Sequence, residues 1–315
     1  MLVLDAAATR AALPWDGLVQ ALGDMFAKGC VMPVRHHHDV EVPGEAEATL
    51  LLMPAWQPGA YIGVKLVSVF PGNQMRGLPA IHGSYLLSSG RTGELLAIVD
   101  GGELTARRTA AASALAARYL AREDASRMLM VGTGRLSANV VEAHASVRPI
   151  RDVRIWGRNS KKAEATAKEL DLKGISVSVA TDLEAAAREA DIISCATLSS
   201  EPLIRGDWLK AGAHLDLIGA FKPTMRESDD RAATRASIFV DTREGALSEG
   251  GDIVQPLRAG VITENAIRAD LFELARGTHP GRTSPDEITL FKSVGAALED
   301  LAGAVLAFEA NRSKA

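Results

Sequence analysis

The sequence predicts an α/β protein in which a doubly wound parallel sheet accompanies a discontinuous, mainly antiparallel α+β domain. Between residues 127 and 243, apolar strand-like runs alternate with helical segments, a spacing that requires parallel strands joined by right-handed crossovers. The region before residue 112 instead contains strand-like runs separated by glycine and proline turns, which is typical of antiparallel pairing. A chain of 315 residues with 47% hydrophobic content is large enough for two cores.

The leading domain is expected to be discontinuous in sequence. Its predicted strands cover residues 48–56, 61–70, 80–89 and 94–102. A helix with small residues along one face follows over 102–125, and we place the domain junction along it. The final segment, residues 286–311, is long, alanine-rich and amphipathic, and is expected to return to the leading domain. This domain therefore comprises residues 1–112 and 290–315, and the parallel-sheet domain comprises residues 113–289.

The parallel-sheet domain is predicted from its order of elements. The expected strands are 127–132, 153–158, 175–180, a run opening near 191, 214–221 and 236–243. The expected helices between them are 136–147, 160–172 and a segment that ends near 190. The prediction of a parallel sheet thus rests on the alternation as a whole.

Composition points to a small-molecule ligand. The 35 basic and 39 acidic residues are interspersed, so neither a nucleic acid nor a membrane surface is an expected partner. The N-terminus lacks a signal-like segment, and we expect a cytoplasmic protein. Cys30 and Cys195 lie in apolar surroundings and are expected to be buried thiols. The run His36–His38 lacks further ligand residues at suitable spacing, so a surface run is expected and no metal site.

A glycine motif follows the strand at 127–132. Gly132, Gly134 and Ser137 fill the pattern G-x-G-x-x-small between a strand and a helix. The first glycine permits the tight turn, the second lets the backbone approach a pyrophosphate, and the small third residue lets the helix pack on the strand. In this setting the motif indicates a dinucleotide-binding domain of the Rossmann type.

The end of the next strand indicates which dinucleotide binds. An NAD site usually places a carboxylate here to accept from the ribose 2′-hydroxyl. This strand instead continues into Arg158, Asn159, Ser160 and Lys161, which suit a 2′-phosphate. NADP(H) is therefore favoured, and NAD(H) remains the alternative if Arg158 and Lys161 are merely solvated.

Strings throughout the chain resemble the ornithine cyclodeaminase and mu-crystallin family. They are KLVSVFPGN (65–73), residues 92–121, VGTG (131–134), WGR (156–158), ATLSSEPLI (196–204), IGAFKPTMRESD (218–229) and ITLFKSVGAALEDLA (288–302). The family includes ornithine cyclodeaminases, ketimine reductases, Δ1-pyrroline-2-carboxylate reductases, alanine dehydrogenases and a thyroid-hormone-binding crystallin. The resemblance also implies that the leading domain binds substrate and forms a homodimer.

The resemblance assigns residues of the leading domain to substrate. Arg35, Lys65 and Arg108 match positions that hold a substrate carboxylate, and Lys65 also qualifies as proton donor to an imine nitrogen. The adjacent Arg107 cannot face the same way as Arg108 on a helix. His82 lies on an apolar strand, where a hydrogen-bonded core histidine is expected and a proton relay is the alternative.

The resemblance also assigns residues to the cofactor. The positions expected beside the nicotinamide are Thr109, Thr197, Leu198, Gly219, Ala220 and Ser293. In the absence of a cofactor, such residues would serve only as strand ends and helix caps.

Departures from the family pattern favour one activity. Where cyclodeaminases carry an aspartate after the fifth strand this chain has Phe221, and Leu51 replaces a glutamate before the LMP string. Without these acids and with the three cations retained, we expect an NAD(P)H-dependent reductase of a cyclic ketimine carboxylate with no acid near the cations and Phe221 against the ring. The alternatives are an ornithine cyclodeaminase, an open-chain imino acid reductase or alanine-type dehydrogenase, and a non-catalytic binder.

Overall fold

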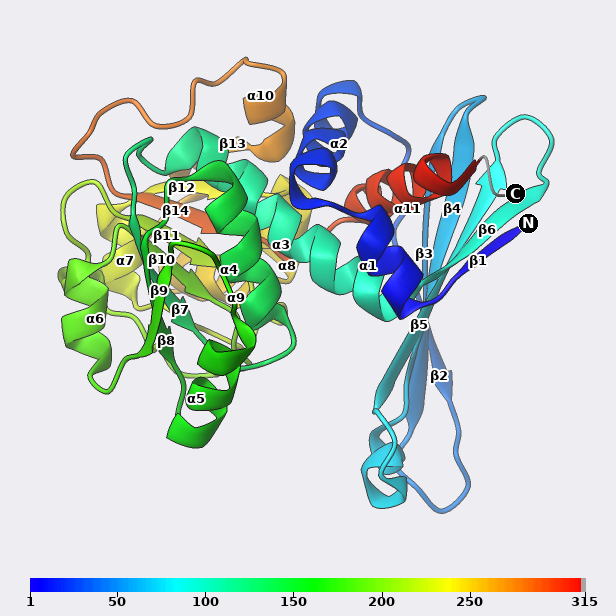
Figure 1. Ribbon diagram of the computed structural model, residues 1–315, viewed down its shortest axis with the longest axis horizontal. Coiled ribbons are helices and arrows are strands. Elements are labelled where there is room, and N and C mark those ends of the chain that lie inside the picture. The colour runs from blue at the N-terminus through cyan, green and yellow to red at the C-terminus, as the bar shows by residue number, and fades with distance from the viewer. Residues whose placement is uncertain (313–315) are drawn as a thin grey trace. The chain divides into compact units, whose positions relative to one another are not determined.

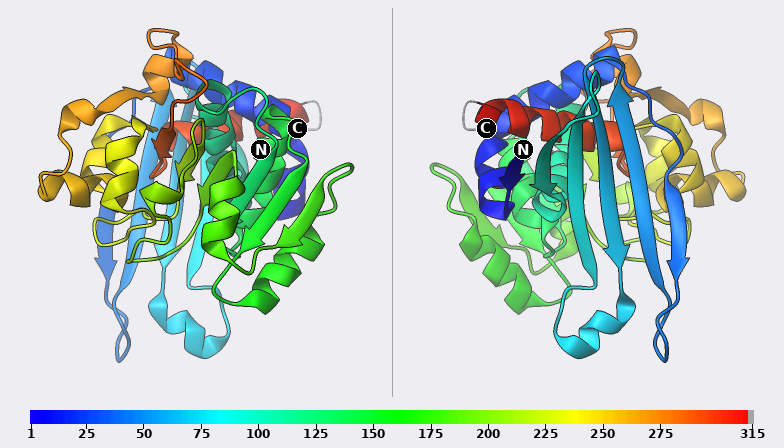
Figure 2. Two further views of the ribbon diagram at one scale, coloured as in Figure 1. Left: turned by 90° about the vertical axis from the view of Figure 1, so that its left-hand side faces the viewer. Right: turned by 90° about the vertical axis from the view of Figure 1, so that its right-hand side faces the viewer.

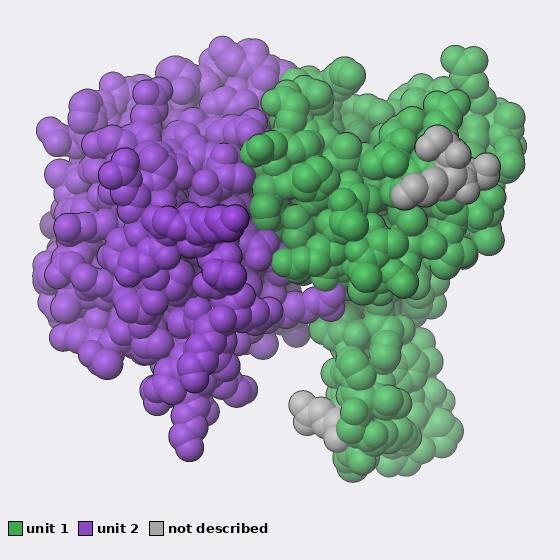
Figure 3. Space-filling model, in the orientation of Figure 1, with its two compact units in different colours: residues 1–108, 297–315 green, residues 109–296 purple. Residues whose placement is uncertain are grey.

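The computed structural model describes residues 1–312 and divides the chain into two compact units (Figures 1 and 3). Unit 1 comprises residues 1–108 with 297–315, and unit 2 comprises residues 109–296. These boundaries differ from the expected 112/113 and 289/290. The later return to unit 1 has a physical reason, because residues 289–292 form a strand in the sheet of unit 2.

Unit 1 is a six-stranded sheet with helices on one face. The order is β1-β6-β5-β4-β3-β2, with β1 parallel to β6 and the other pairs antiparallel. Its strands are β1 (Leu2–Leu4), β2 (His36–Val40), β3 (Ala48–Gln57), β4 (Tyr61–Val69), β5 (Ile81–Ser89) and β6 (Leu95–Asp100). Its helices are α1 (Ala6–Ala12), α2 (Trp15–Lys28), the 3-10 turn η1 (Pro71–Arg76), the start of α3 (Gly101–Leu120) and α11 (Ala297–Asn311).

The sheet of unit 1 has a covered and an open face. Alternate residues such as Met53, Tyr85 and Val99 are buried on the side where α11 crosses β3 to β6. On the other side no described helix covers the strands, as the right-hand view of Figure 2 shows. The alternation therefore leaves one apolar sheet face without a cover inside the unit.

Unit 2 is an eight-stranded, wholly parallel sheet of order β13-β12-β14-β11-β10-β7-β8-β9, which confirms the predicted doubly wound fold. Its strands are β7 (Arg127–Val131), β8 (Asp152–Trp156), β9 (Ser176–Val179), β10 (Ile192–Cys195), β11 (His214–Leu217), β12 (Ser237–Val240), β13 (Ile267–Asp270) and β14 (Thr289–Lys292). Its helices are the rest of α3, α4 (Leu136–Val147), α5 (Ser160–Glu169), α6 (Leu183–Glu189), η2 (Gly206–Trp208), α7 (Asp230–Arg235), α8 (Arg243–Ser248), α9 (Gly251–Arg258), η3 (Glu264–Ala266) and α10 (Leu271–Ala275).

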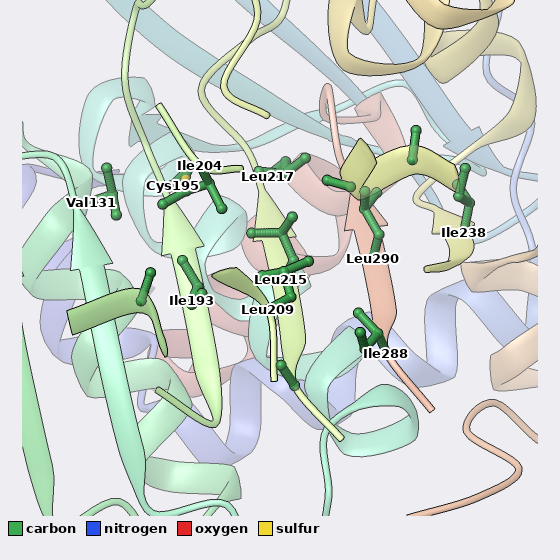
Figure 4. Packing of buried hydrophobic residues seen from close by; sticks show 14 of the residues in the cluster. Val131, Ile193, Cys195, Ile204, Leu209, Leu215, Leu217, Ile238, Ile288 and Leu290 are labelled. Carbon is green, nitrogen blue, oxygen red and sulfur yellow. The ribbon is translucent and has the colours of Figure 1, made fainter. Parts of the chain in front are cut away.

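An aliphatic core holds the parallel strands in place. Val131, Ile193, Leu215 and Leu290 project from four of them into one buried cluster (Figure 4). Each fully buried aliphatic side chain contributes about 1.5–3 kcal/mol. This core fixes the carboxyl ends of the strands, the edge at which open parallel sheets bind their ligands.

Three local expectations need correction. The segment expected to be one long helix from residue 286 contains β14, because a short, fully buried apolar run cannot be told from a buried helix turn by periodicity. His82 is exposed on the open sheet face, so it is not a core histidine. Cys195 is buried as expected, but Cys30 is only half-buried, and both thiols are free.

Candidate active site

The glycine turn after β7 has the geometry that a bound pyrophosphate requires. Gly132 has φ +129°, and a Cβ there would lie 2.7 Å from the Ala196 carbonyl oxygen, so only glycine fits. A Cβ on Gly134 would meet nothing within 4 Å, which leaves its backbone open to a ligand. Ser137 is fully buried at the start of α4, as expected for the small third residue. These residues fit a dinucleotide.

The residues expected to select the dinucleotide lie at the end of β8, beside this turn. A Cβ on Gly157 would approach the Thr133 side chain to 2.6 Å, so the strand end and the turn are neighbours. Arg158 and Lys161 are exposed, and neither forms an ion pair within residues 1–312. Asn159 caps α5, since its Oδ1 accepts from the Lys162 backbone N–H at 3.2 Å. The arrangement can present a cation to an anionic group.

The loops after β10 and β11 carry four of the residues expected beside the nicotinamide. Thr197 and Leu198 follow β10, and Gly219 and Ala220 follow β11; these two strands pair in parallel. A Cβ on Gly219 would overlap the Thr197 backbone, so the loops are in contact. Leu198 is 71% exposed. Unit 2 thus brings these four residues to one edge of the sheet.

Buried carboxylates stand behind this edge, and the sequence did not reveal them. Glu227 accepts from both the backbone N–H and the hydroxyl of Thr197, each at 2.7 Å. Asp241 accepts from the Ser293 hydroxyl at 2.9 Å and from the next two backbone N–H groups. Burial raises the pKa of Glu227 to about 7, while the nearby Lys292 ammonium opposes the rise.

In unit 1, two of the three expected cations lie together in a buried ionic cluster. Lys65 Nζ is 2.6 Å from Asp300 Oδ2, and Arg108 Nε is 3.0 Å from Asp300 Oδ1. Arg108 Nη1 is 2.6 Å from Glu299 Oε2. Two cations therefore face two carboxylates, with Asp300 bridging both cations.

The surroundings perturb Lys65. Burial lowers the pKa of its ammonium to about 8, and the Asp300 carboxylate opposes the fall. Tyr85 pairs with Lys65 across β4 and β5, and burial raises the pKa of its phenol well above the usual range. Its hydroxyl finds no hydrogen-bond partner within residues 1–312. A lysine that titrates near neutrality is suited to donate a proton.

The expectation that no acid lies near the cations is wrong. Glu299 and Asp300 lie in the final segment, whose amphipathic pattern predicts packing against the leading domain and no charged cluster. A signal was available, since an adjacent acid pair interrupts the apolar run 296–308, and buried acids require paired cations. The lack of a carboxylate at Phe221 and Leu51 therefore says little about the acids of this cluster.

The remaining expected residues are placed as follows. Arg107 stacks on the Trp15 ring at 3.8 Å, away from the partners of Arg108, as adjacency on a helix predicts. Arg35 is half-buried just before β2, and the Leu298 N–H···Met32 sulfur contact of 3.2 Å brings its segment to the start of α11. Two further residues are Thr109, half-buried on α3, and Phe221, 43% exposed on the loop after β11.

The chain resembles known proteins over most of its length. A model of the ornithine cyclodeaminase/mu-crystallin family matches residues 18–315. A Δ1-pyrroline-2-carboxylate reductase of Paracoccus denitrificans is 40% identical over 290 residues, which is 92% of this chain and 90% of the relative.

Two solved structures superpose over the whole chain. One is the Thermococcus litoralis Δ1-pyrroline-2-carboxylate reductase in complex with NADH and L-proline, with a TM-score of 0.91, 33% identity and coverage of 100% of this chain and 98% of the other. The other is an archaeal alanine dehydrogenase dimer with bound NAD, with a TM-score of 0.89, 32% identity and coverage of 100% and 97%.

Proposed function

The chain belongs to the ornithine cyclodeaminase/mu-crystallin family, and we propose that within it the protein is an NAD(P)H-dependent reductase of a cyclic ketimine carboxylate. The substrate is Δ1-pyrroline-2-carboxylate or Δ1-piperideine-2-carboxylate, and the product is L-proline or L-pipecolate. The observation that carries the proposal is the buried pair of Lys65 and Arg108, in a chain 40% identical to a reductase of that substrate.

The cations of unit 1 recognise the substrate. Arg108 and Arg35 bind the substrate carboxylate through guanidinium donors, which fix it in one plane. Lys65 has three N–H donors, of which Asp300 takes one in this structure, so the ammonium also reaches the carboxylate or the imine nitrogen. Phe221 is the apolar wall against the ring.

The proton and the hydride come from different sources. When bound, the reduced nicotinamide supplies a hydride to the imine carbon. Lys65 Nζ donates the proton to the imine nitrogen, and its lowered pKa makes that donation easier at neutral pH. The carboxylates of Asp300 and Glu299 hold Lys65 and Arg108 in place during this transfer.

The cofactor is held by unit 2. Gly132 and Gly134 contact the pyrophosphate, and the loops that carry Thr197 and Gly219 line the nicotinamide. Arg158, with Asn159 and Lys161 beside it, favours NADP(H) through its exposed cation. NAD(H) is the alternative, and the two neighbouring structures hold NADH and NAD.

A substrate panel tests the activity. We expect purified protein to oxidise NADPH, and NADH less well, with Δ1-pyrroline-2-carboxylate and Δ1-piperideine-2-carboxylate. L-ornithine with NAD should release no ammonia. Ammonia release without imine turnover would instead establish a cyclodeaminase, and tight cofactor binding without turnover of any substrate would establish a non-catalytic binder.

An open-chain imino acid reductase or alanine-type dehydrogenase is the second candidate. It is favoured by the 32% identity to the archaeal alanine dehydrogenase. Pyruvate with ammonia, offered with either reduced cofactor, distinguishes the two activities. Turnover of this mixture in preference to the cyclic imines would support the second candidate.

We further propose that the protein is a homodimer that pairs through the open sheet face of unit 1. This face carries the apolar side chains Leu52, Pro54, Val64, Leu66, Leu86 and Ile98, all half-buried within one chain. Apolar side chains gathered on one face typically mark an interface, and a second copy offers the same surface. Light scattering should give twice the mass of one chain.

A further inference from the structure

Glu227 is a fully buried carboxylate that the proposed reaction does not use. Its Oε1 accepts from the Thr197 backbone N–H and hydroxyl, each at 2.7 Å. Its Oε2 accepts from the backbone N–H of Gly219 at 2.8 Å and of Ala220 at 3.3 Å. One side chain therefore joins the loop after β10 to the loop after β11.

The carboxylate is itself held in position. Its backbone N–H donates to Asp252 Oδ1 at 2.8 Å, and Asp252 Oδ2 pairs with the buried Lys292 ammonium at 3.1 Å. A Cβ on Gly219 would overlap Glu227 Oε1, so the loop approaches the carboxylate as closely as glycine permits. Such a fixed acceptor sets the direction of every hydrogen that it receives.

We infer that Glu227 is a positioning residue that makes this edge of the cofactor site select a nicotinamide carboxamide. The inference rests on the proposed function, because it assumes that a nicotinamide lies against these loops. It deepens that function by naming the group that distinguishes the carboxamide from other substituents at the same ring position.

The selection follows from where the hydrogens point. A hydroxyl has one hydrogen, and Thr197 gives it to Glu227, so the hydroxyl can only accept from a ligand. The Ser199 N–H uses one acceptor site of this hydroxyl at 3.3 Å, which leaves one more. The N–H groups of Gly219 and Ala220 are also taken by Glu227. The Thr197 hydroxyl oxygen, as an acceptor, therefore suits the –NH2 of a carboxamide and repels a carboxylate.

The variant Glu227→Gln tests the inference. The glutamine side chain has one acceptor oxygen where glutamate has two. Its –NH2 group would therefore face the N–H donors of one of the two loops. In the protein without cofactor, amide hydrogen exchange in residues 196–200 and 218–222 should become faster. The affinity for NAD, measured by calorimetry, should fall about tenfold, which corresponds to about 1.4 kcal/mol.

Analogues test the selection itself. Wild-type protein should bind nicotinic acid adenine dinucleotide, whose carboxylate replaces the carboxamide, at least about tenfold more weakly than NAD. The ratio should shrink in Glu227→Gln and in Thr197→Val, which keeps the three backbone N–H bonds to Glu227 but removes the hydroxyl. Glu201→Gln, an exposed glutamate on the same loop, is the matched control and should change nothing.

Several results would overturn the inference. Unchanged exchange and unchanged NAD affinity in Glu227→Gln would exclude a positioning role. If that variant does not fold, equal binding of the two dinucleotides by the wild type, or an unaltered ratio in Thr197→Val, would exclude the selection. Failure of the wild type to bind any nicotinamide dinucleotide would refute the proposed function, whereas the exchange measurement on the free protein would still decide the role of Glu227.

Discussion

Asp300→Asn removes the charge that touches both buried cations of unit 1. In the native protein Asp300 Oδ2 lies 2.6 Å from Lys65 Nζ, and both side chains are nearly inaccessible to solvent. Asparagine keeps the size of the side chain but not its charge. Lys65 would then remain buried beside Arg108 without the carboxylate that offsets their repulsion, so its charged form becomes less favourable.

The expected change in the pKa of Lys65 follows from the contact distance. At 2.6 Å and an effective dielectric constant of about 20, the pair attracts by roughly 6 kcal/mol. If relaxation of the surroundings offsets two thirds of this lost attraction, the charged form of Lys65 is destabilised by about 2 kcal/mol. This lowers the pKa of Lys65 by roughly 1.5 units. The pKa of Lys65, about 8 in the native protein, would then fall below neutrality.

The pH profile of kcat/KM measures this change. A lysine with a depressed pKa loses its proton as pH rises through that pKa, so a lysine that donates a proton gives an alkaline limb. We expect this limb near pH 8 in the wild type and below pH 7 in Asp300→Asn, with activity at pH 7 reduced by about fourfold, because the protonated fraction of Lys65 falls by that factor. Urea denaturation should show a loss of about 3–5 kcal/mol, since one partner of a buried pair is removed.

Glu299→Gln is the control for this experiment. Glu299 contacts Arg108 and is only the smallest of the charges that raise the pKa of Lys65, so the alkaline limb should move much less than in Asp300→Asn. An unmoved limb in Asp300→Asn, with the protein folded, would refute the role of Lys65 as the titrating donor. Equal movement in both variants would show that the limb belongs to another group.

Three further changes test other parts of the structure. Gly132→Ala places a Cβ at φ +129° and 2.7 Å from a carbonyl oxygen, so calorimetry should show at least a tenfold loss of dinucleotide affinity (about 1.4 kcal/mol). Arg158→Ala should weaken NADPH about tenfold but leave NADH within about twofold, and equal losses would remove the argument for NADP(H). Leu86→Asp puts a charge in the centre of the open sheet face and should yield monomers by light scattering, whereas an unchanged mass would move the interface elsewhere.

The parallel-sheet unit could be predicted because its signals are local. The helix expected over 136–147 is α4 to the residue, since a glycine turn begins it and the apolar period is regular. β13 and β14 escaped prediction although β9 to β12 are equally short, because β13 has two charged residues among its four and β14 directly precedes the amphipathic run of α11. The helices α1 and α2 were not predicted either, although Asp5 caps α1 by accepting from the Ala8 N–H.

The candidate site was predictable in its donors and not in its acceptors. Arg108 and Lys65 can be identified by family resemblance, yet what each can do depends on which carboxylates reach it, and Asp300 lies 192 residues along the chain from Arg108. The same holds for Glu227, which follows its partner Thr197 by 30 residues and acquires its role only when two parallel strands align. A buried cation requires a counter-charge, so two cations expected in one pocket already imply acids nearby. The acids that lie in the apolar helix α11 are Glu299 and Asp300, and they are the counter-charges of Arg108 and Lys65.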